Sequence, residues 1–482
     1  MLFHTWTFLL FFLVVMGGFF ALRRSRFWLH WLMLASYVFY GWWNPYYLIL
    51  ILYSTALDYW VVQWMDRCPD RRAPGYLESR KTGFFGSRLV WLWVSIVNNL
   101  SLLFFFKYAN FFIANLNWTF HLLGATWHLP SADRLMPFDL DYLLPVGISF
   151  FTFQSMSYTI DFYYGKIHRE RSFIKFATFV SFFPQLVAGP IERAKNLLPQ
   201  FNQFPKVTRQ DVTDGLSLFL VGLFKKLALA NYLSFYVERI YEDPSRFNSA
   251  ALLLGTFAFA WQIYFDFSGY TDMARGIART MGFRLMLNFN HPYLATSLGD
   301  FWGRWHISLS TWFRDYVYVP MGGNRNGTFN LYRNLLITFV ISGFWHGAAW
   351  TFVVWGGLHA FGTMATRALE ATSWYRDRVP RFVKQLAVFM FVCFAWIFFR
   401  ADSMSDAWLI ITRIASTGWA SPDMPILMIL MICAVWIYQW LNESSVRRWL
   451  EHSSVRIGTG IAMILYMFLF STGGGEFIYF QF

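Results

Sequence analysis

Charged residues are scarce in this chain. Asp, Glu, Lys and Arg make up 14% of its 482 residues, whereas soluble proteins of this size carry about 25%. Hydrophobic residues reach 56% and aromatic residues 22%, and apolar runs recur along the whole length. This composition excludes an ordinary soluble domain and predicts a multi-span membrane protein with aromatic residues at both interfaces.

Cysteines and several common catalytic motifs are also few or missing. The three cysteines, Cys68, Cys393 and Cys433, have no metal-ligand spacing, which argues against a disulfide framework and a cysteine-based metal site. The sequence has neither a Gly-x-Ser-x-Gly elbow nor the Gly-Lys-Ser/Thr ending of a P-loop. No motif therefore supports a serine hydrolase or a P-loop nucleotide hydrolase. We therefore expect no bound metal.

Positive charge is abundant but dispersed. The net charge is +13, yet the basic residues lie in short loops between apolar segments, so the positive-inside rule explains them better than nucleic-acid binding does. The first apolar stretch, residues 2–22, is followed by Arg23, Arg24 and Arg26, the reverse of a signal peptide. This order predicts an uncleaved first span with the N-terminus outside.

The apolar runs predict an all-α integral membrane protein of about eleven or twelve transmembrane helices in one domain, residues 1–482. The basic loop 67–88 is expected in the cytoplasm and the acidic stretch 110–141 outside. Residues 173–190 and 275–333 lack a clean span and predict re-entrant segments. The expected spans lie near residues 3–22 and 27–43, in a third segment that ends near 64, in a fourth before residue 110, and near 143–164, 212–236, 250–272, 335–350, 351–369, 383–400, 425–441 and 456–471.

Two histidines within apolar surroundings are the main candidates for chemistry. His306 lies in a Trp-rich stretch with amphipathic helical spacing, and His346 lies between Gly343 and Gly347. Imidazole can accept a proton from a hydroxyl as that hydroxyl attacks an acyl group, a role worth about 10²–10⁴-fold in rate. The alternatives are a packing role for His346, and for His306 an interfacial helix from which the imidazole reaches water.

Two further features have alternative explanations. Asp266 and Asp272, near the end of an apolar span, suit structural ion pairs with nearby arginines better than a proton relay. The glycine-rich loop 322–327 offers backbone amides and Arg325 to an anionic group such as a phosphate.

Motifs spread over the chain carry a family resemblance. They are Ser181–Arg193, Tyr264–Asp272, Arg304–Ser310 with Asp315-Tyr316, Gly343–Gly347 and Glu476–Phe482. In this order they resemble the membrane-bound O-acyltransferase family, and within it the bacterial branch of alginate O-acetylases and teichoic-acid D-alanyl transferases.

The resemblance implies a ring of tilted helices around a central tunnel and a catalytic pair, His346 as base and His306 as a second histidine that orients or polarises the donor carbonyl. It implies transfer of an acyl group, most simply acetyl, from a cytoplasmic thioester to an external hydroxyl. Candidates for donor binding are Arg304, Ser310, Arg314, Asp315 and Arg325.

The same resemblance implies substrates and partners. Acetyl-CoA is the expected donor substrate, with a carrier-protein thioester as the alternative, and no cofactor is expected to be bound. The expected acceptor is a polysaccharide or a residue of an external SGNH-type partner that relays the acyl group. The expected location is the bacterial inner membrane, and nucleic acid is not an expected partner.

Two non-enzymatic functions are alternatives. The chain could be a transporter or channel for an acyl carrier or polysaccharide, although no internal repeat supports a repeat-built transporter. It could also be a scaffold for a secretion complex, in which both histidines would be dispensable. Loss of His346 separates these functions, because only an acyltransferase needs the imidazole for its activity.

Overall fold

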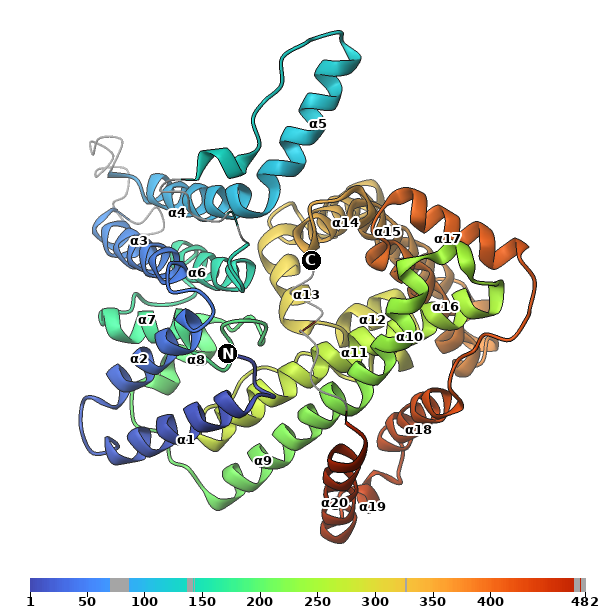
Figure 1. The fold of residues 1–482 in the computed structure, drawn as a ribbon. Helices are drawn as coiled ribbons and strands as arrows, with labels where there is room; N and C mark the ends of the chain where they lie inside the picture. The colour runs from blue at the N-terminus through green and yellow to red at the C-terminus, as the bar shows by residue number, and fades with distance from the viewer. Residues whose placement is uncertain (70–85, 137–141, 143, 326, 472–476, 478–482) are drawn as a thin grey trace. The chain divides into compact units, whose positions relative to one another are not determined.

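The computed structural model describes residues 1–69, 86–136, 142, 144–325, 327–471 and 477 (Figure 1). The chain divides into two compact units, Met1–Val212 with Ala278–Leu285 and Thr213–Ile277 with Met286–Phe482. The single domain over residues 1–482 stays a prediction. Most of the basic loop, the acidic residues Asp139 and Asp141, and the C-terminal motif apart from Phe477 lie outside the described residues.

Helices are the regular secondary structure of the described ranges, in which no strand occurs. A helix satisfies its backbone hydrogen bonds internally, which a segment in hydrocarbon requires because no water is present to do so. The all-α prediction is confirmed.

Six helical segments of the described chain are long and apolar enough to cross a membrane. The apolar helices α1 (Trp6–Ala21) and α18 (Ile426–Asn442) are shorter. A multi-pass membrane protein is thus confirmed, whereas eleven or twelve crossings stays a prediction. The six segments are α3 (Tyr47–Arg67), Arg88–Leu122 with α4 (Arg88–Leu103) and α5 (Ala109–Leu122), Arg209–Glu242 with α9 (Arg209–Phe224) and α10 (Asn231–Glu242), α11 (Ser249–Thr280), α16 (Arg381–Arg400) and α20 (Ser453–Phe470).

The first unit buries a polar cluster between three of its helices, α3, α4 and α6 (Ile148–Tyr163). Asp58 of α3 has no exposed surface and accepts hydrogen bonds from Ser95 Oγ (2.6 Å), Asn99 Nδ2 (2.9 Å) and Ser155 Oγ. Because these donors come from α4 and α6, one carboxylate joins three helices.

The first predicted re-entrant segment contains α7 (Phe173–Ser181), which is nine residues long and too short to span a membrane. The chain from 182 to 193 is irregular and buried. Gln154 Nε2 and Gln185 Nε2 both donate to the carbonyl oxygen of Phe179, at 2.6 and 2.8 Å. Side chains therefore satisfy a carbonyl near the end of the helix, as irregular backbone inside a membrane protein requires. The unit also contains α2 (Trp28–Gly41) and α8 (Ala194–Leu197).

The second unit is built on α11 and on a close pair of helices, α14 (Gly327–His346) and α15 (Trp350–Glu370), which lie side by side in Figure 1. A Cβ atom at Gly343 would overlap the carbonyl oxygen of Phe352, and one at Gly356 would overlap that of Phe339. Glycine at both positions therefore lets the two backbones touch.

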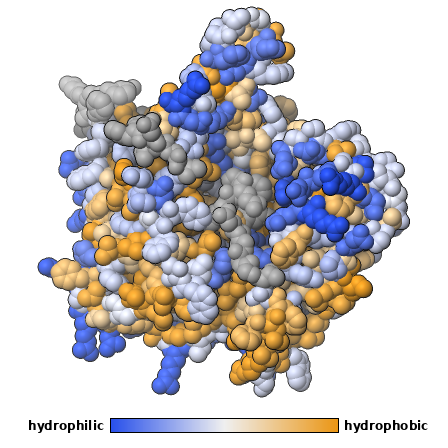
Figure 2. All heavy atoms as spheres, viewed as in Figure 1, coloured by the Kyte–Doolittle hydropathy of each residue, from blue (hydrophilic) through white to orange (hydrophobic). Residues whose placement is uncertain are grey.

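The remaining helices of this unit include α17 (Met404–Ser416), which is not among the spans predicted from the sequence, and α19 (Arg447–Leu450). Large apolar side chains are exposed on α18 and α20, including Ile426, Leu430, Leu465 and Phe468. Their surface is largely apolar in Figure 2, as a lipid-facing helix requires.

Candidate active site

His306 lies at a break between two short helices, α12 (Leu298–Arg304) and α13 (Ile307–Phe313). Its backbone is left-handed, with φ of 42°, a conformation that is uncommon for a residue with a side chain. The amphipathic stretch of the sequence is therefore not one continuous helix. His306 also has no exposed surface, so the alternative in which its imidazole reaches water is wrong.

Asn288 holds this turn in place. Its carbonyl oxygen accepts a hydrogen bond from Ile307 N at 3.0 Å, and its Oδ1 accepts from Ser308 N at 3.2 Å and Ser308 Oγ at 3.0 Å. Asn288 is 1% exposed. These bonds stabilise the residues directly after His306, and a strained backbone persists only where its surroundings fix it in this way.

His346 is the last residue of α14 and is 5% exposed. A Cβ atom at the next residue, Gly347, would overlap the ring of Phe352, so glycine lets this ring pack directly against the backbone after His346. Ser342 lies one helical turn before His346 on the same face of α14, because residues four apart share a helix face.

The structure brings the two predicted histidines together. The ring centroids of His306 and His346 are 6.5 Å apart, with an angle of 55° between the ring planes. The two rings are close enough for a single reacting group to contact both. His306 lies outside the helices that could span a membrane, and burial lowers the pKa of its imidazole to about 3. Its imidazole is therefore neutral near pH 7.

Aromatic rings enclose the pair. Trp345, Trp355 and Phe399 pack edge-on against His346, with centroids at 4.9, 5.1 and 5.4 Å. Phe267 packs edge-on against His306 at 4.6 Å. These rings exclude water, which strengthens hydrogen bonds and charge interactions within the site.

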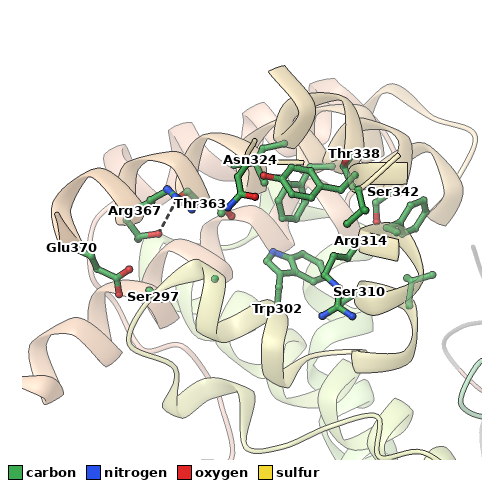
Figure 3. A pocket seen from close by; sticks show the side chains of 18 residues that line it. Ser297, Trp302, Ser310, Arg314, Asn324, Thr338, Ser342, Thr363, Arg367 and Glu370 are labelled. Atoms are coloured by element: carbon green, nitrogen blue, oxygen red, sulfur yellow. Dashed lines mark hydrogen bonds between the residues drawn. The ribbon is translucent and has the colours of Figure 1, made fainter. Parts of the chain in front are cut away.

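A pocket of about 510 Å³ lies in the same unit (Figure 3). Among the predicted donor-binding residues, Ser310 and Arg314 line it. Its lining also includes Ser342, one turn before His346 on α14, but neither of the two histidines. Arg367 and Glu370 lie at the end remote from Ser342. The arrangement offers cations, neutral hydrogen-bonding groups and aromatic surface to one elongated ligand.

The other three predicted donor-binding residues do not line this pocket. Arg304 forms ion pairs with Asp300 (2.7 Å) and Glu443. Asp315 pairs with Arg314 at 2.9 Å, and Arg325 lies on the exposed loop next to Asn324, which does line the pocket. Arg304 thus joins α12 to the end of α18, and its role in donor binding stays a prediction.

Trp302 and Arg367 line the pocket and were not among the predicted site residues. The indole N–H of Trp302 has no hydrogen-bond partner among the described residues, although a buried donor normally has one. Trp302 lies in the same Trp-rich stretch as His306, so the sequence offered a signal for it. No local sequence pattern indicates that Arg367 belongs to the site.

Asp266 and Asp272 form ion pairs, as predicted, but with different main partners. Asp266 pairs with Lys226 at 2.5 Å, and Asp272 pairs with Lys225 at 2.6 Å and with Arg275 at 3.5 Å. The lysines lie in the π-helical turn Lys225–Ala230, which packs against α11. These carboxylates therefore join two segments of the second unit.

Comparison with known proteins identifies a family over most of the chain. The sequence model of MBOAT, the membrane-bound O-acyltransferase family, matches residues 94–404. The chain is 38% identical to the probable alginate O-acetylase AlgI of Pseudomonas aeruginosa over 425 residues, which cover 87% of this chain and 75% of that protein.

The names of two other relatives refer to cell-wall polymers. The peptidoglycan O-acetyltransferase of Helicobacter pylori is 33% identical over 513 aligned positions, covering 94% of this chain and 91% of that protein. The teichoic acid D-alanyltransferase of Bacillus subtilis is 29% identical over 274 positions, covering 53% of this chain and 68% of that protein.

Proposed function

The chain belongs to the membrane-bound O-acyltransferase family and is an O-acyltransferase, and we propose that it moves an acetyl group from a cytoplasmic thioester to a hydroxyl on the external side. The product is an O-acetylated exopolysaccharide or cell-wall polymer. The names of the alginate and peptidoglycan relatives support acetyl as the group and a polymer as the acceptor. Family membership disfavours the transporter, channel and scaffold alternatives.

The observation that carries this proposal is the facing pair of histidines, 6.5 Å apart within aromatic walls. His346 accepts the proton of the acceptor hydroxyl while its oxygen attacks the thioester carbonyl carbon. The carbon–oxygen bond forms, the carbon–sulfur bond breaks, and the leaving thiolate takes the proton from His346. His306, neutral at physiological pH, donates a hydrogen bond to the carbonyl oxygen as negative charge develops there.

The pocket beside α14 suits the donor. Arg314 and Arg367 offer positive charge to donor phosphates, while Ser310 and the indole N–H of Trp302 can bind the amide groups of a pantetheine arm. Ser342 lines the pocket one turn before His346 on α14, which supports a donor that extends from the pocket toward His346. Acetyl-CoA is the proposed donor, and an acyl-carrier protein presents the same arm and is the alternative.

The proposed orientation in the membrane and the proposed acceptor rest on the distribution of charged residues and on family membership. The arginines after the first apolar stretch support an N-terminus outside. The bacterial relatives support a location in a bacterial inner membrane. The hydroxyl then belongs either to the polymer itself or to an SGNH-type partner that passes the acetyl group on to it. Both acceptors present the same group to His346.

Replacement of His346 tests the proposal. His346→Gln should lower polymer acetylation by about 10²–10⁴-fold, because the amide of glutamine cannot accept the proton of the acceptor hydroxyl. The measurement is O-acetyl content of the surface polymer in a deletion strain that carries each variant. His30→Gln is the matched control, since His30 is exposed and lies in the other unit. Near-normal acetylation by His346→Gln, at equal membrane abundance, would rule out the assignment.

A further inference from the structure

Hydroxyl groups are frequent in the lining of the pocket beside α14, but several have already used their hydrogen. Four of them donate to backbone carbonyl oxygens, at distances of 2.7–3.0 Å. A hydroxyl carries one hydrogen, so these groups can only accept a hydrogen bond from a ligand. They belong to Ser310, Thr338, Thr363 and Thr366.

Ser342 differs from these four residues. Its side chain lines the pocket and is 6% exposed, yet its hydroxyl forms no hydrogen bond with any residue that the structure describes. Thr338, one turn earlier on α14, donates to the carbonyl oxygen of Asn334 at 2.7 Å. A buried hydroxyl normally has a partner. Ser342 therefore offers a hydrogen to whatever occupies its end of the pocket.

The other lining hydroxyls that donate to no described residue lie at the opposite end. Ser297 is on the side of Arg367 in Figure 3, away from Ser342. Tyr318 is also near Arg367, because burial raises the pKa of its hydroxyl while the charge of that arginine lowers it. Ser342 is thus the hydroxyl with an available hydrogen at the end of the pocket that is one turn from His346.

From these observations we infer that Ser342 donates a hydrogen bond to the amide carbonyl that comes first after the thioester in the pantetheine arm of the acyl donor. The inference rests on the proposed function, since that function places the arm in this pocket. Ser342 and His346 are separated by a rise of about 6 Å along α14. The thioester carbon and the first amide carbon of an extended arm are separated by a similar length.

The neighbouring hydroxyls fit this assignment. An amide needs an acceptor for its N–H and a hydrogen-bond donor for its carbonyl oxygen. Ser310 donates to the carbonyl oxygen of Trp305 and so can accept from the N–H, whereas Ser342 can donate to the carbonyl. The indole N–H of Trp302 remains for the second amide of the arm. A thioester without the first amide leaves Ser342 unpaired, so Ser342 contributes specificity for pantetheine thioesters.

Ser342→Ala tests the contact in inverted membrane vesicles from a deletion strain that expresses the full chain. Labelled acetyl-CoA is supplied over a range of concentrations, and label in the polymer is counted. The KM for acetyl-CoA should rise by about 3–10-fold with kcat unchanged, because the lost bond binds a part of the donor that does not react. Ser342→Cys keeps the shape but is a weak hydrogen-bond donor, so it should behave in the same way.

Thr55→Val is the matched control. Thr55 lies in the other unit, has no exposed surface, and its hydroxyl also has no partner among the described residues. This variant therefore removes an equally buried hydroxyl that does not line the pocket. Its KM for acetyl-CoA should equal that of the parent protein. Folding of every variant is judged by abundance in the membrane and a single peak in size-exclusion chromatography.

Two further donors sharpen the test. In an acetyl-CoA analogue with two methylene groups in place of the first amide, Ser342 has no carbonyl to bind. The parent protein should have a higher KM for this analogue than for acetyl-CoA, and Ser342→Ala should raise that KM no further. Acetylated acyl-carrier protein presents the same arm, so comparison of its rate with that of acetyl-CoA distinguishes the two sources. The effect of Ser342→Ala should be the same with either source.

The outcomes separate the inference from the function. If both folded Ser342 variants keep the parent KM, or if kcat falls while KM stays the same, the contact is wrong although acyl transfer stands. An equal loss by Ser342→Ala with the analogue and with acetyl-CoA also contradicts the contact. If the parent protein transfers label from neither acetyl-CoA nor the acetylated carrier protein, the proposed function fails and the inference fails with it.

Discussion

Each unit of the chain buries polar groups deep among apolar residues, but the surroundings differ. In the first unit, Asp58 accepts hydrogen bonds on both carboxylate oxygens, from Ser95, Asn99 and Ser155. In the second unit, His346 is enclosed mainly by the faces and edges of aromatic rings. The first arrangement satisfies a polar group with side chains from neighbouring helices, and the second encloses one in apolar surface.

Under the proposed function, this difference separates a structural site from a reactive one. A carboxylate whose oxygens are both hydrogen-bonded holds helices together and has little capacity left for a substrate. An imidazole between apolar rings meets substrate without competition from water, which favours proton transfer and carbonyl polarisation. A buried polar residue in a membrane protein therefore has either a structural or a catalytic role. The groups that surround it indicate which of the two roles it has.

The largest expected effect on stability comes from Asp58→Ala. The change leaves donors of Ser95, Asn99 and Ser155 without their acceptor, which should cost about 3 kcal/mol or more of unfolding free energy. Thermal unfolding of the purified protein in detergent measures the loss. Activity per folded molecule should stay at the parent level, and Asp58→Asn should lose less stability because it keeps one acceptor oxygen. A loss of activity at unchanged stability would place Asp58 in the reaction.

A smaller effect, on activity rather than stability, is expected for Asn288→Ala. Without the Oδ1 acceptor, the backbone of Ser308 is held less firmly and the His306 ring moves from its position opposite His346. Misplacement by about 1 Å can cost about 10²-fold in rate. Asn288→Asp keeps an acceptor oxygen and should restore part of the lost kcat. Equal losses in the two variants would contradict a role for this hydrogen bond.

The sequence identified the two histidines through their apolar surroundings and their family motifs, and it predicted the all-α membrane fold. It did not reveal the break at His306, because the group that holds the turn, Asn288, lies 18 residues earlier and belongs to no periodic pattern. Arg304 occurs in the same motif as His306, yet its guanidinium pairs with Glu443, 139 positions away. Such distant partners cannot be read from local spacing.

The smallest expected effect concerns the rim of the pocket. Arg314 is 61% exposed and already pairs with Asp315, so its attraction for a donor phosphate is screened by water and shared. Arg314→Gln should raise the KM for acetyl-CoA by about 2–5-fold and leave kcat unchanged. Arg376→Gln, which removes another exposed, paired arginine that does not line the pocket, is the control. A large loss of kcat in the Arg314 variant would place that residue nearer the reacting atoms.

The central claim is that the facing histidines divide the work, with His306 on the donor carbonyl and His346 on the acceptor hydroxyl. Purified His306→Ala and His346→Ala variants with labelled acetyl-CoA test this most directly, when donor binding and acceptor-dependent release of label are measured separately. We expect His346→Ala to bind donor and fail to release label to an acceptor. We expect His306→Ala to lose productive donor binding or thioester cleavage even without acceptor. Normal donor handling by His306→Ala together with lost donor binding by His346→Ala would contradict the account.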